Sequence, residues 1–123
     1  MRIKYSTIEL LKLDIHLRTL RDTQQFNDIN SIAENLGISP ATWPLFGVLW
    51  PAGEILARHV QSMQVKDLKI LEVGCGIGLP SLVLNSMDAN ISATDHHPMA
   101  GDFLNENSQL NQGSKIPFFR SDW

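Results

Sequence analysis

Hydrophobic and polar residues alternate strictly between residues 11 and 17. A period of two is typical of a half-buried strand, so this segment is predicted to be a strand. The preceding residues 3–8 are rich in β-forming side chains and are predicted to form its partner. The apolar positions of the alternation are Leu11, Leu13, Ile15 and Leu17. The pattern therefore predicts an N-terminal hairpin.

Two short helices are expected after the hairpin. The first covers residues 29–36, with Asp28 as its N-cap and Gly37 directly after its end. The second covers residues 40–46 and begins at a proline, which suits the first position of a helix. The hairpin and the first helix are expected to form an N-terminal appendage over residues 1–40.

A longer helix is predicted over residues 51–63. Its apolar positions recur at helical spacing, so this face of the helix should lie against the core. The residues of this stripe are Ile55, Leu56, His59, Val60 and Met63.

Short strands and helices alternate from residue 68 onward. The predicted strands cover residues 69–73, 91–94 and 117–120, and the predicted helices cover residues 79–87 and 99–111. This succession is typical of an α/β protein with a parallel sheet and right-handed crossovers. Residues 41–123 are therefore expected to form a second unit built on such a sheet.

Composition places the chain among globular proteins, with 43% hydrophobic and 19% charged residues in a length of 123, the size of one small domain. Its formal net charge of −3 argues against a broad surface for nucleic acid. The single cysteine, Cys75, has no partner for an internal disulfide. No apolar run approaches the roughly 20 residues of a membrane span, and the N-terminus lacks the apolar region of a signal peptide. A cytoplasmic protein is therefore expected.

Three glycines occur at alternate positions in the segment E-V-G-C-G-I-G, residues 72–78, between a predicted strand and a predicted helix. Glycine lets the backbone turn sharply and approach a ligand with no Cβ in the way. Asp95 ends the next strand, 21 residues after Gly74. Its carboxylate should lie at the same sheet edge as the loop, where it can accept both hydroxyls of a ribose. The pair predicts an adenosine-containing ligand.

The spacing of the glycines separates two classes of such ligand. A dinucleotide fingerprint needs a third small residue at the position that Leu79 occupies here. Glu72 would be awkward beside a pyrophosphate but suits a ligand with an ammonium and a sulfonium centre. S-adenosylmethionine has both groups, and we expect it as the cofactor.

The E-V-G-C-G-I-G segment resembles the first motif of the seven-strand, Rossmann-like S-adenosylmethionine-dependent methyltransferases, and Asp95 stands where their ribose-binding acid stands. The chain is also similar to the lysine-methyltransferase-like branch of that fold. The shared elements are a glycine-to-Trp-Pro segment, here G-V-L-W-P at residues 47–51, an N-x-x-x-N spacing at Asn107 and Asn111, and an acid followed by Trp at Asp122 and Trp123. The resemblance covers about residues 43–123 and implies the Rossmann-like parallel sheet of a class I methyltransferase.

The resemblance also implies a cofactor site. Its expected residues are Trp50, Glu72, Gly74, Cys75, Gly76, Gly78, Asp95, His96, Asp122 and Trp123. The glutamate and the glycines would shape the methionine and sugar side, and Asp95 would hold the ribose. His96 would flank the adenine, with Asp122 and Trp123 at its far side. Trp50 would wall the pocket near the cofactor.

Several of these residues also have purely structural interpretations. Glycines after a strand form plain tight turns, and a residue such as Asp95 is often the N-cap of the next helix. Trp50 suits core packing as well as ligand contact. Cys75 needs only to be small, and a nucleophilic role is not expected. His96 and His97 diverge at a strand end and lack further ligands, so no metal site is predicted.

Only three parallel strands can be identified, whereas a methyltransferase sheet of this type has seven. We therefore expect the chain to be the cofactor-binding half of a longer enzyme, inactive by itself, and we assign no catalytic residue. The strand over residues 69–73 would then have an unpaired edge, which favours a homodimer or strand swap.

The predicted function is that of an S-adenosylmethionine-dependent methyltransferase, with a protein lysine as the favoured methyl acceptor. Small molecules and RNA stay open as acceptors because a fold does not determine a substrate. The alternative is a non-catalytic cofactor-binding or interaction module. A nicotinamide-dependent oxidoreductase is less favoured because of Leu79.

Overall fold

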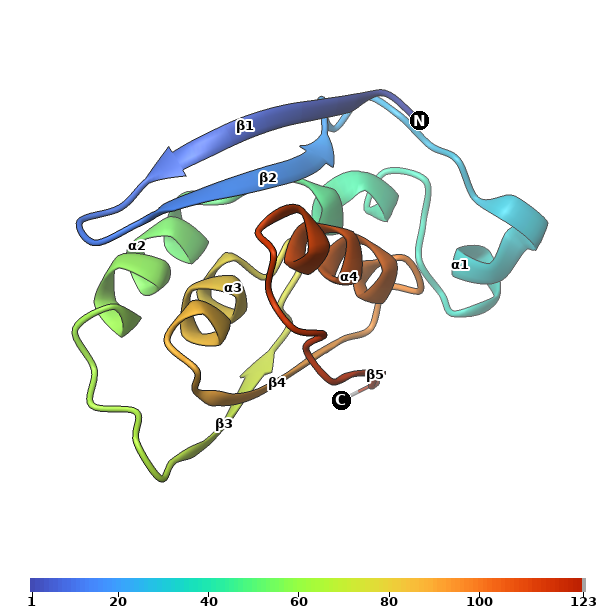
Figure 1. Ribbon diagram of the computed structural model, residues 1–123. Helices are drawn as coiled ribbons and strands as arrows, with labels where there is room; N and C mark the ends of the chain where they lie inside the picture. Colours follow the sequence, from blue (N-terminus) through green and yellow to red (C-terminus); the bar gives the residue numbers. More distant parts are fainter. Residues whose placement is uncertain (123) are drawn as a thin grey trace.

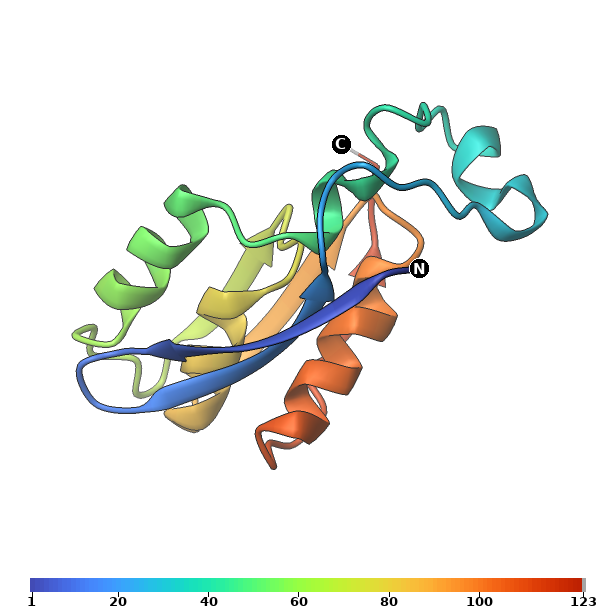
Figure 2. The same cartoon turned by 90° about the horizontal axis from the view of Figure 1, so that it is seen from above.

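The computed structural model describes residues 1–122, and Trp123 lies outside them. Three layers are stacked in it: an N-terminal hairpin, a layer of helices and a parallel sheet (Figure 1). The hairpin consists of β1 (Ile3–Glu9) and β2 (Asp14–Leu20), which pair antiparallel. Seen from above, the hairpin crosses over the helices on their side away from the sheet (Figure 2).

The second half of the chain forms the parallel sheet. Its strands are β3 (Lys69–Val73), β4 (Asn90–Asp95) and β5 (Phe118–Arg120), in the order β3-β4-β5. Helix α3 (Leu79–Ser86) connects the first two strands, and α4 (Ala100–Leu110) connects the last two. The structure confirms the predicted parallel α/β arrangement.

Four helical segments lie between the hairpin and the sheet along the chain. They are the 3-10 helices η1 (Ile29–Ser31) and η2 (Trp43–Gly47) and the α-helices α1 (Ile32–Asn35) and α2 (Pro51–Val60). The helix predicted over residues 29–36 is broken at Asn30 and Ser31, whose φ angles are +58° and +55°, so the N-cap position of α1 belongs to Ser31 and not to Asp28. The Asp28 carboxylate still accepts the N–H groups of Ala33 at 2.8 Å and Glu34 at 3.0 Å in the first turn of α1. None of the helices within residues 1–122 has the length and apolar character needed to cross a bilayer.

A single hydrophobic core extends from the hairpin to the sheet. Its largest fully buried apolar side chains come from β2, η2 and the two crossover helices, and they include Ile15, Leu17, Leu20, Trp43, Leu79 and Leu104. Because the inner face of β2 packs on α3 and α4, the hairpin buries the side of these helices that points away from the sheet.

Two asparagines, one in α4 and one directly after its end, bond to the free edge of β2. Asn107 Oδ1 accepts the N–H of Arg18 at 2.6 Å, and Asn107 Nδ2 donates to the Arg18 carbonyl at 3.0 Å. Asn111 makes the same pair of bonds with His16, at 2.8 Å and 2.7 Å. Four helical residues rise about 6 Å and two strand residues about 7 Å, so the two amides match alternate residues of β2. The two asparagine side chains, at N-x-x-x-N spacing, thus make the hydrogen bonds that a neighbouring strand would make.

The second strand of the hairpin lies further along the chain than the alternation predicted. Leu11 is 88% exposed, because the Leu10 N–H donates to the Leu13 carbonyl and closes a turn there. Pairing begins with Glu9 opposite Asp14 and continues to Leu20. The prediction of a strand over residues 11–17 was therefore wrong at its start, since turn and strand share the same apolar alternation.

Helix α2 turns a different face to the core than its periodicity predicted. Ala57 and Val60 are buried, and Val60 is the only buried member of the predicted stripe. The exposed members are Ile55, Leu56, His59 and Met63. The physical reason is that α2 packs on α3 along one side, and no described element covers its Ile55–Leu56 side.

One face of the parallel sheet is uncovered by the described residues. Leu71, Val73 and Phe119 lie on this face and are 50%, 55% and 51% exposed. Strand β3 pairs with β4 alone within residues 1–122, so its other edge is unpaired there. Parallel sheets are ordinarily covered on both faces, which makes this side of the molecule unusual.

Candidate functional site

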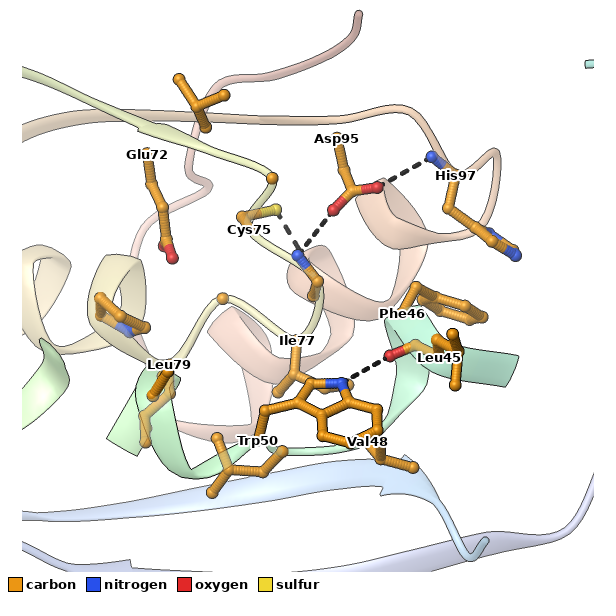
Figure 3. Close-up of a pocket in the computed structure, with 18 of the residues that line it drawn as sticks. Leu45, Phe46, Val48, Trp50, Glu72, Cys75, Ile77, Leu79, Asp95 and His97 are labelled. Atoms are coloured by element: carbon orange, nitrogen blue, oxygen red, sulfur yellow. Dashed lines mark hydrogen bonds between the residues drawn. The ribbon is translucent and has the colours of Figure 1, made fainter. Parts of the chain in front are cut away.

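A cavity of about 680 Å³ opens at the carboxyl ends of β3 and β4 (Figure 3). Its polar side is formed by residues 72–78 and 95–97, and its apolar side comes from η2, the start of α2 and nearby residues. Open α/β sheets place their ligand sites at this edge, where successive loops leave the strands.

The glycine loop, residues 74–78, has a backbone that other residues would strain. Gly74, Gly76 and Gly78 have φ angles of +63°, +53° and +77°. A Cβ on Gly78 would lie 2.7 Å from a methyl carbon of Leu104, and one on Gly76 would lie 3.1 Å from the carbonyl oxygen of Phe46. Glycine is therefore required both for the conformation and for close packing on both sides of the loop.

Asp95 ties the glycine loop to the end of β4. One carboxylate oxygen accepts the N–H of Gly76 at 2.8 Å, and the other accepts the N–H of His97 at 2.9 Å (Figure 3). The N-cap interpretation of Asp95 is wrong, because α4 begins only at Ala100. Each oxygen retains capacity for a further donor, so the carboxylate can still accept a ligand hydroxyl at the cavity wall.

Glu72 points from β3 toward α3. Its Oε1 accepts the N–H of Ser81 at 3.1 Å and the hydroxyl of Ser81 at 2.5 Å. Burial raises the pKa of the Glu72 carboxyl above its ordinary value, and these hydrogen bonds oppose the rise. Glu72 thus connects the strand before the glycine loop with the helix after it, at the wall of the cavity.

Cys75 is buried within the glycine loop. Burial raises the pKa of its thiol, and the negative charges of Glu72 and Asp95 raise it further. The thiol therefore stays protonated at neutral pH, which disfavours a nucleophilic thiolate.

Trp50 lies on the apolar side of the cavity, directly before α2. Its indole N–H donates to the Leu45 carbonyl at 2.9 Å, and the residue is 49% exposed. The core tryptophan is instead Trp43, which is fully buried. Sequence reasoning did not identify the other apolar wall residues, which include Ile38, Leu45, Val48, Leu49 and Leu56.

His96 lines the cavity next to Asp95. Its Nε2 lies 3.0 Å from the Leu36 carbonyl oxygen, at the end of α1. Its Nδ1 lies 3.8 Å from a carboxylate oxygen of the exposed Asp122. The structure therefore brings His96 and Asp122 together, while the predicted contribution of Trp123 lies outside the described residues.

Sequence reasoning missed His97 and Phe46 as parts of the site. The His97 ring stacks on the Phe46 ring with centroids 3.9 Å apart, and its Nδ1 accepts the N–H of Met99 at 3.1 Å. Burial lowers the pKa of His97 to about 4, so the ring is neutral at physiological pH. The position of His97, two residues after Asp95, was the one feature of the sequence that could have indicated its place in the site. Within residues 1–122, no three His, Cys, Asp or Glu side chains group to hold a metal ion.

The fold of this chain resembles that of solved methyltransferases. The chain aligns with the tRNA (uracil-54, C5)-methyltransferase of Pyrococcus abyssi, solved with S-adenosyl-L-homocysteine, with a TM-score of 0.55 and 17% identity over 96% of this chain and 24% of that one. A SAM-dependent methyltransferase from Agrobacterium tumefaciens aligns with a TM-score of 0.53 and 16% identity over 95% and 31%. The fold is the Rossmann-like α/β fold of class I methyltransferases.

Sequence comparison narrows this class to one family. Residues 34–123 match the family model described as lysine methyltransferase, and the chain belongs to that family. It is 28% identical over 107 residues to the electron transfer flavoprotein beta subunit lysine methyltransferase of Danio rerio, covering 85% of this chain and 40% of the relative. The Homo sapiens protein of that name is 28% identical over 87 residues, covering 68% and 33%. The chain thus spans well under half the length of these relatives.

Proposed function

We propose that this chain forms the cofactor-binding part of an S-adenosylmethionine-dependent methyltransferase that modifies a protein lysine. The observation that carries the proposal is Asp95, whose carboxylate is held by two backbone N–H groups beside the glycine loop and faces the cavity. This is the arrangement that a ribose with two hydroxyls requires from an α/β sheet edge.

The residues around the cavity fit such a cofactor. Asp95 would hold the ribose. Gly76 has no side chain, so the loop beside Asp95 keeps the space that a Cβ would fill. Glu72 and the rest of the glycine loop would face the methionine side, with His96 toward the adenine and Trp50 on the opposite wall. Leu79 is fully buried at the start of α3, so the third small residue of a dinucleotide fingerprint has no counterpart.

S-adenosylmethionine supplies a methyl group on a sulfonium sulfur, which a neutral amine nitrogen can accept. The apolar wall around Leu45 and Trp50 would exclude water and favour the uncharged form of an entering lysine. The chain's contribution is then to bind and orient the two reactants. We assign no catalytic base to its residues.

Lysine is favoured as the acceptor by family membership and by the charge of the chain. The family model is that of a lysine methyltransferase, and the net charge of −3 provides no broad basic surface for RNA. We also propose a cytoplasmic location, an appendage over residues 1–40 beside the cofactor unit over 41–123, and self-association through the β3 edge.

Calorimetric titration of this chain with S-adenosylhomocysteine tests the cofactor assignment. The parent chain is expected to bind it, and Asp95→Asn should weaken binding about tenfold, because a carboxamide cannot accept from two backbone N–H groups and a ribose together. Asp88→Asn is the matched control: Asp88 is exposed and has a φ of +58°, which asparagine tolerates. Binding of NAD in place of S-adenosylhomocysteine would contradict the assignment.

The acceptor is tested separately with the full-length gene product. Methyl label from S-adenosylmethionine should appear as methyllysine after hydrolysis of a protein substrate mixture. Label recovered in RNA alone would overturn the lysine assignment and leave the cofactor assignment standing.

A further inference from the structure

We infer that the N-terminal hairpin positions the glycine loop, acting through a contact between Leu20 of β2 and Gly47 of η2. The inference rests on the proposed function in one respect, since it treats the glycine loop as the cofactor site. All described residues that line the cavity lie at or beyond Ile38, so the hairpin itself does not touch the cavity. Any effect of the hairpin on the site must therefore pass through an intermediate element.

The hairpin is firmly attached to α4. Besides the asparagine pair at its edge, the Arg18 guanidinium lies 5.0 Å from the centre of the Phe103 ring and forms an ion pair with Glu106 at 2.9 Å. The backbone and the side chain of β2 are thus both held by one helix. This attachment makes β2 a rigid surface against which other elements can rest.

Helix η2 rests on that surface at Gly47. A Cβ on Gly47 would lie 2.5 Å from both Cγ and Cδ1 of Leu20, a separation that real Cβ atoms do not show. Leu20 is 1% exposed and Gly47 is buried. Glycine therefore allows η2 to approach β2 more closely than any other residue would.

Helix η2 in turn supports the site. The carbonyl oxygen of Phe46 lies 3.1 Å from the position of a Cβ on Gly76, and the Phe46 ring stacks on His97. Gly76 and His97 are also the two residues whose N–H groups donate to Asp95. A shift of η2 would thus reach both hydrogen bonds that orient the Asp95 carboxylate. Leu20 and Gly47 are positioning residues, because they do not line the cavity and act on the site through their neighbours in η2.

A double-mutant cycle in the 123-residue chain tests the inference. Gly47→Ala should push η2 away from β2 and weaken S-adenosylhomocysteine binding about tenfold. Leu20→Ala removes the atoms that the new methyl group would meet, so the double variant should bind more tightly than Gly47→Ala alone. Ile116→Ala, a buried change near β5, controls for a general loss of stability. If Gly47→Ala does not fold, Leu20→Val is used in its place, because it alters the same Leu20–Gly47 contact more mildly.

A second readout does not depend on ligand binding. In two-dimensional NMR spectra of the ligand-free chain, the Gly76 amide resonance should move in Gly47→Ala, return toward its parent position in the double variant and stay in place in Ile116→Ala. The inference is overturned if the Gly76 amide resonance does not move in Gly47→Ala. It is also overturned if neither Gly47→Ala nor the double variant changes the affinity for S-adenosylhomocysteine. A parent chain that does not bind S-adenosylhomocysteine, but whose Gly76 resonance responds, contradicts the proposed function alone.

Discussion

His97 contributes to the candidate site through two separate parts of the residue. Its backbone N–H donates to Asp95, and its buried ring stacks on Phe46. The backbone contact is independent of the side chain, but the ring packing depends on a neutral imidazole, since a charged ring in this environment would be poorly solvated. The packing beneath the site is therefore sensitive to pH.

The free energy of unfolding should fall as the pH falls from about 6.5 to about 4. The folded pKa of His97 is lowered from 6.5 to about 4, so between these values the unfolded chain binds a proton that the folded chain does not. The loss due to this residue should reach about 2–3 kcal/mol. Urea denaturation at several pH values should show a shallower pH dependence for His97→Asn, whose amide oxygen can accept the Met99 N–H in place of Nδ1.

The exposed His59 provides the control for this measurement. His59→Asn should keep the parent's pH dependence. An unchanged slope in His97→Asn would show that His97 does not account for the acid sensitivity.

At the scale of elements, β2 and α4 are joined by side-chain amides in place of a third strand. Asn107 is fully buried and hydrogen-bonds to both the N–H and the carbonyl of Arg18. Asn111 makes the same two bonds with the more exposed His16. A strand edge buried on a helix would otherwise have unpaired N–H and C=O groups. The two asparagines, which we call the asparagine clamp, therefore pair the N–H and C=O groups at the edge of β2 and determine the register of the hairpin on α4.

Asn107→Ala should destabilise the chain by about 2 kcal/mol, because the N–H and C=O of Arg18 would lose their partners in a partly buried place. Asn111→Ala should cost less, since water can reach the His16 backbone. Asn105→Ala, on the same helix, should have a small effect of either sign. Chemical denaturation measures the free energy of unfolding of the three variants. Equal values for Asn107→Ala and Asn105→Ala would refute the role of the asparagine clamp.

At the scale of the whole molecule, the three layers leave one side open. The helices and the hairpin cover one face of the sheet, while Leu71, Val73 and Phe119 on the other face are about half exposed. The edge of β3, which has no partner strand within residues 1–122, borders the same side. An edge strand with exposed apolar side chains favours pairing with another chain.

The 123-residue chain should therefore self-associate at the concentrations used in sedimentation. Leu71→Lys should prevent this, because a charged side chain on an edge strand opposes pairing. Leu11→Lys makes the same change at the exposed turn of the hairpin and should leave association intact. A parent chain that sediments as a monomer throughout the range contradicts this expectation.

The residue pattern by itself determined the order of strands and helices, the glycine loop and the place of Asp95. These features are local: the helices and strands follow from periodicity, and the loop follows from glycine's freedom at positive φ. The hydrogen bonds from the first turn of α1 to Asp28 are local in the same way, since the bonded groups are close in sequence, but the break at Asn30 and Ser31 was not predicted.

Only the tertiary structure decided which apolar face of α2 is buried, that Phe46 and His97 support the site, and that Asn107 and Asn111 hold the hairpin. Each of these depends on groups far apart in the chain, such as Asn107 and Arg18, which are separated by 89 residues. Periodicity shows that a helix has an apolar stripe, but what covers the stripe depends on how the layers pack. The close approach of Gly47 to Leu20 likewise arises only when the hairpin lies on the helices.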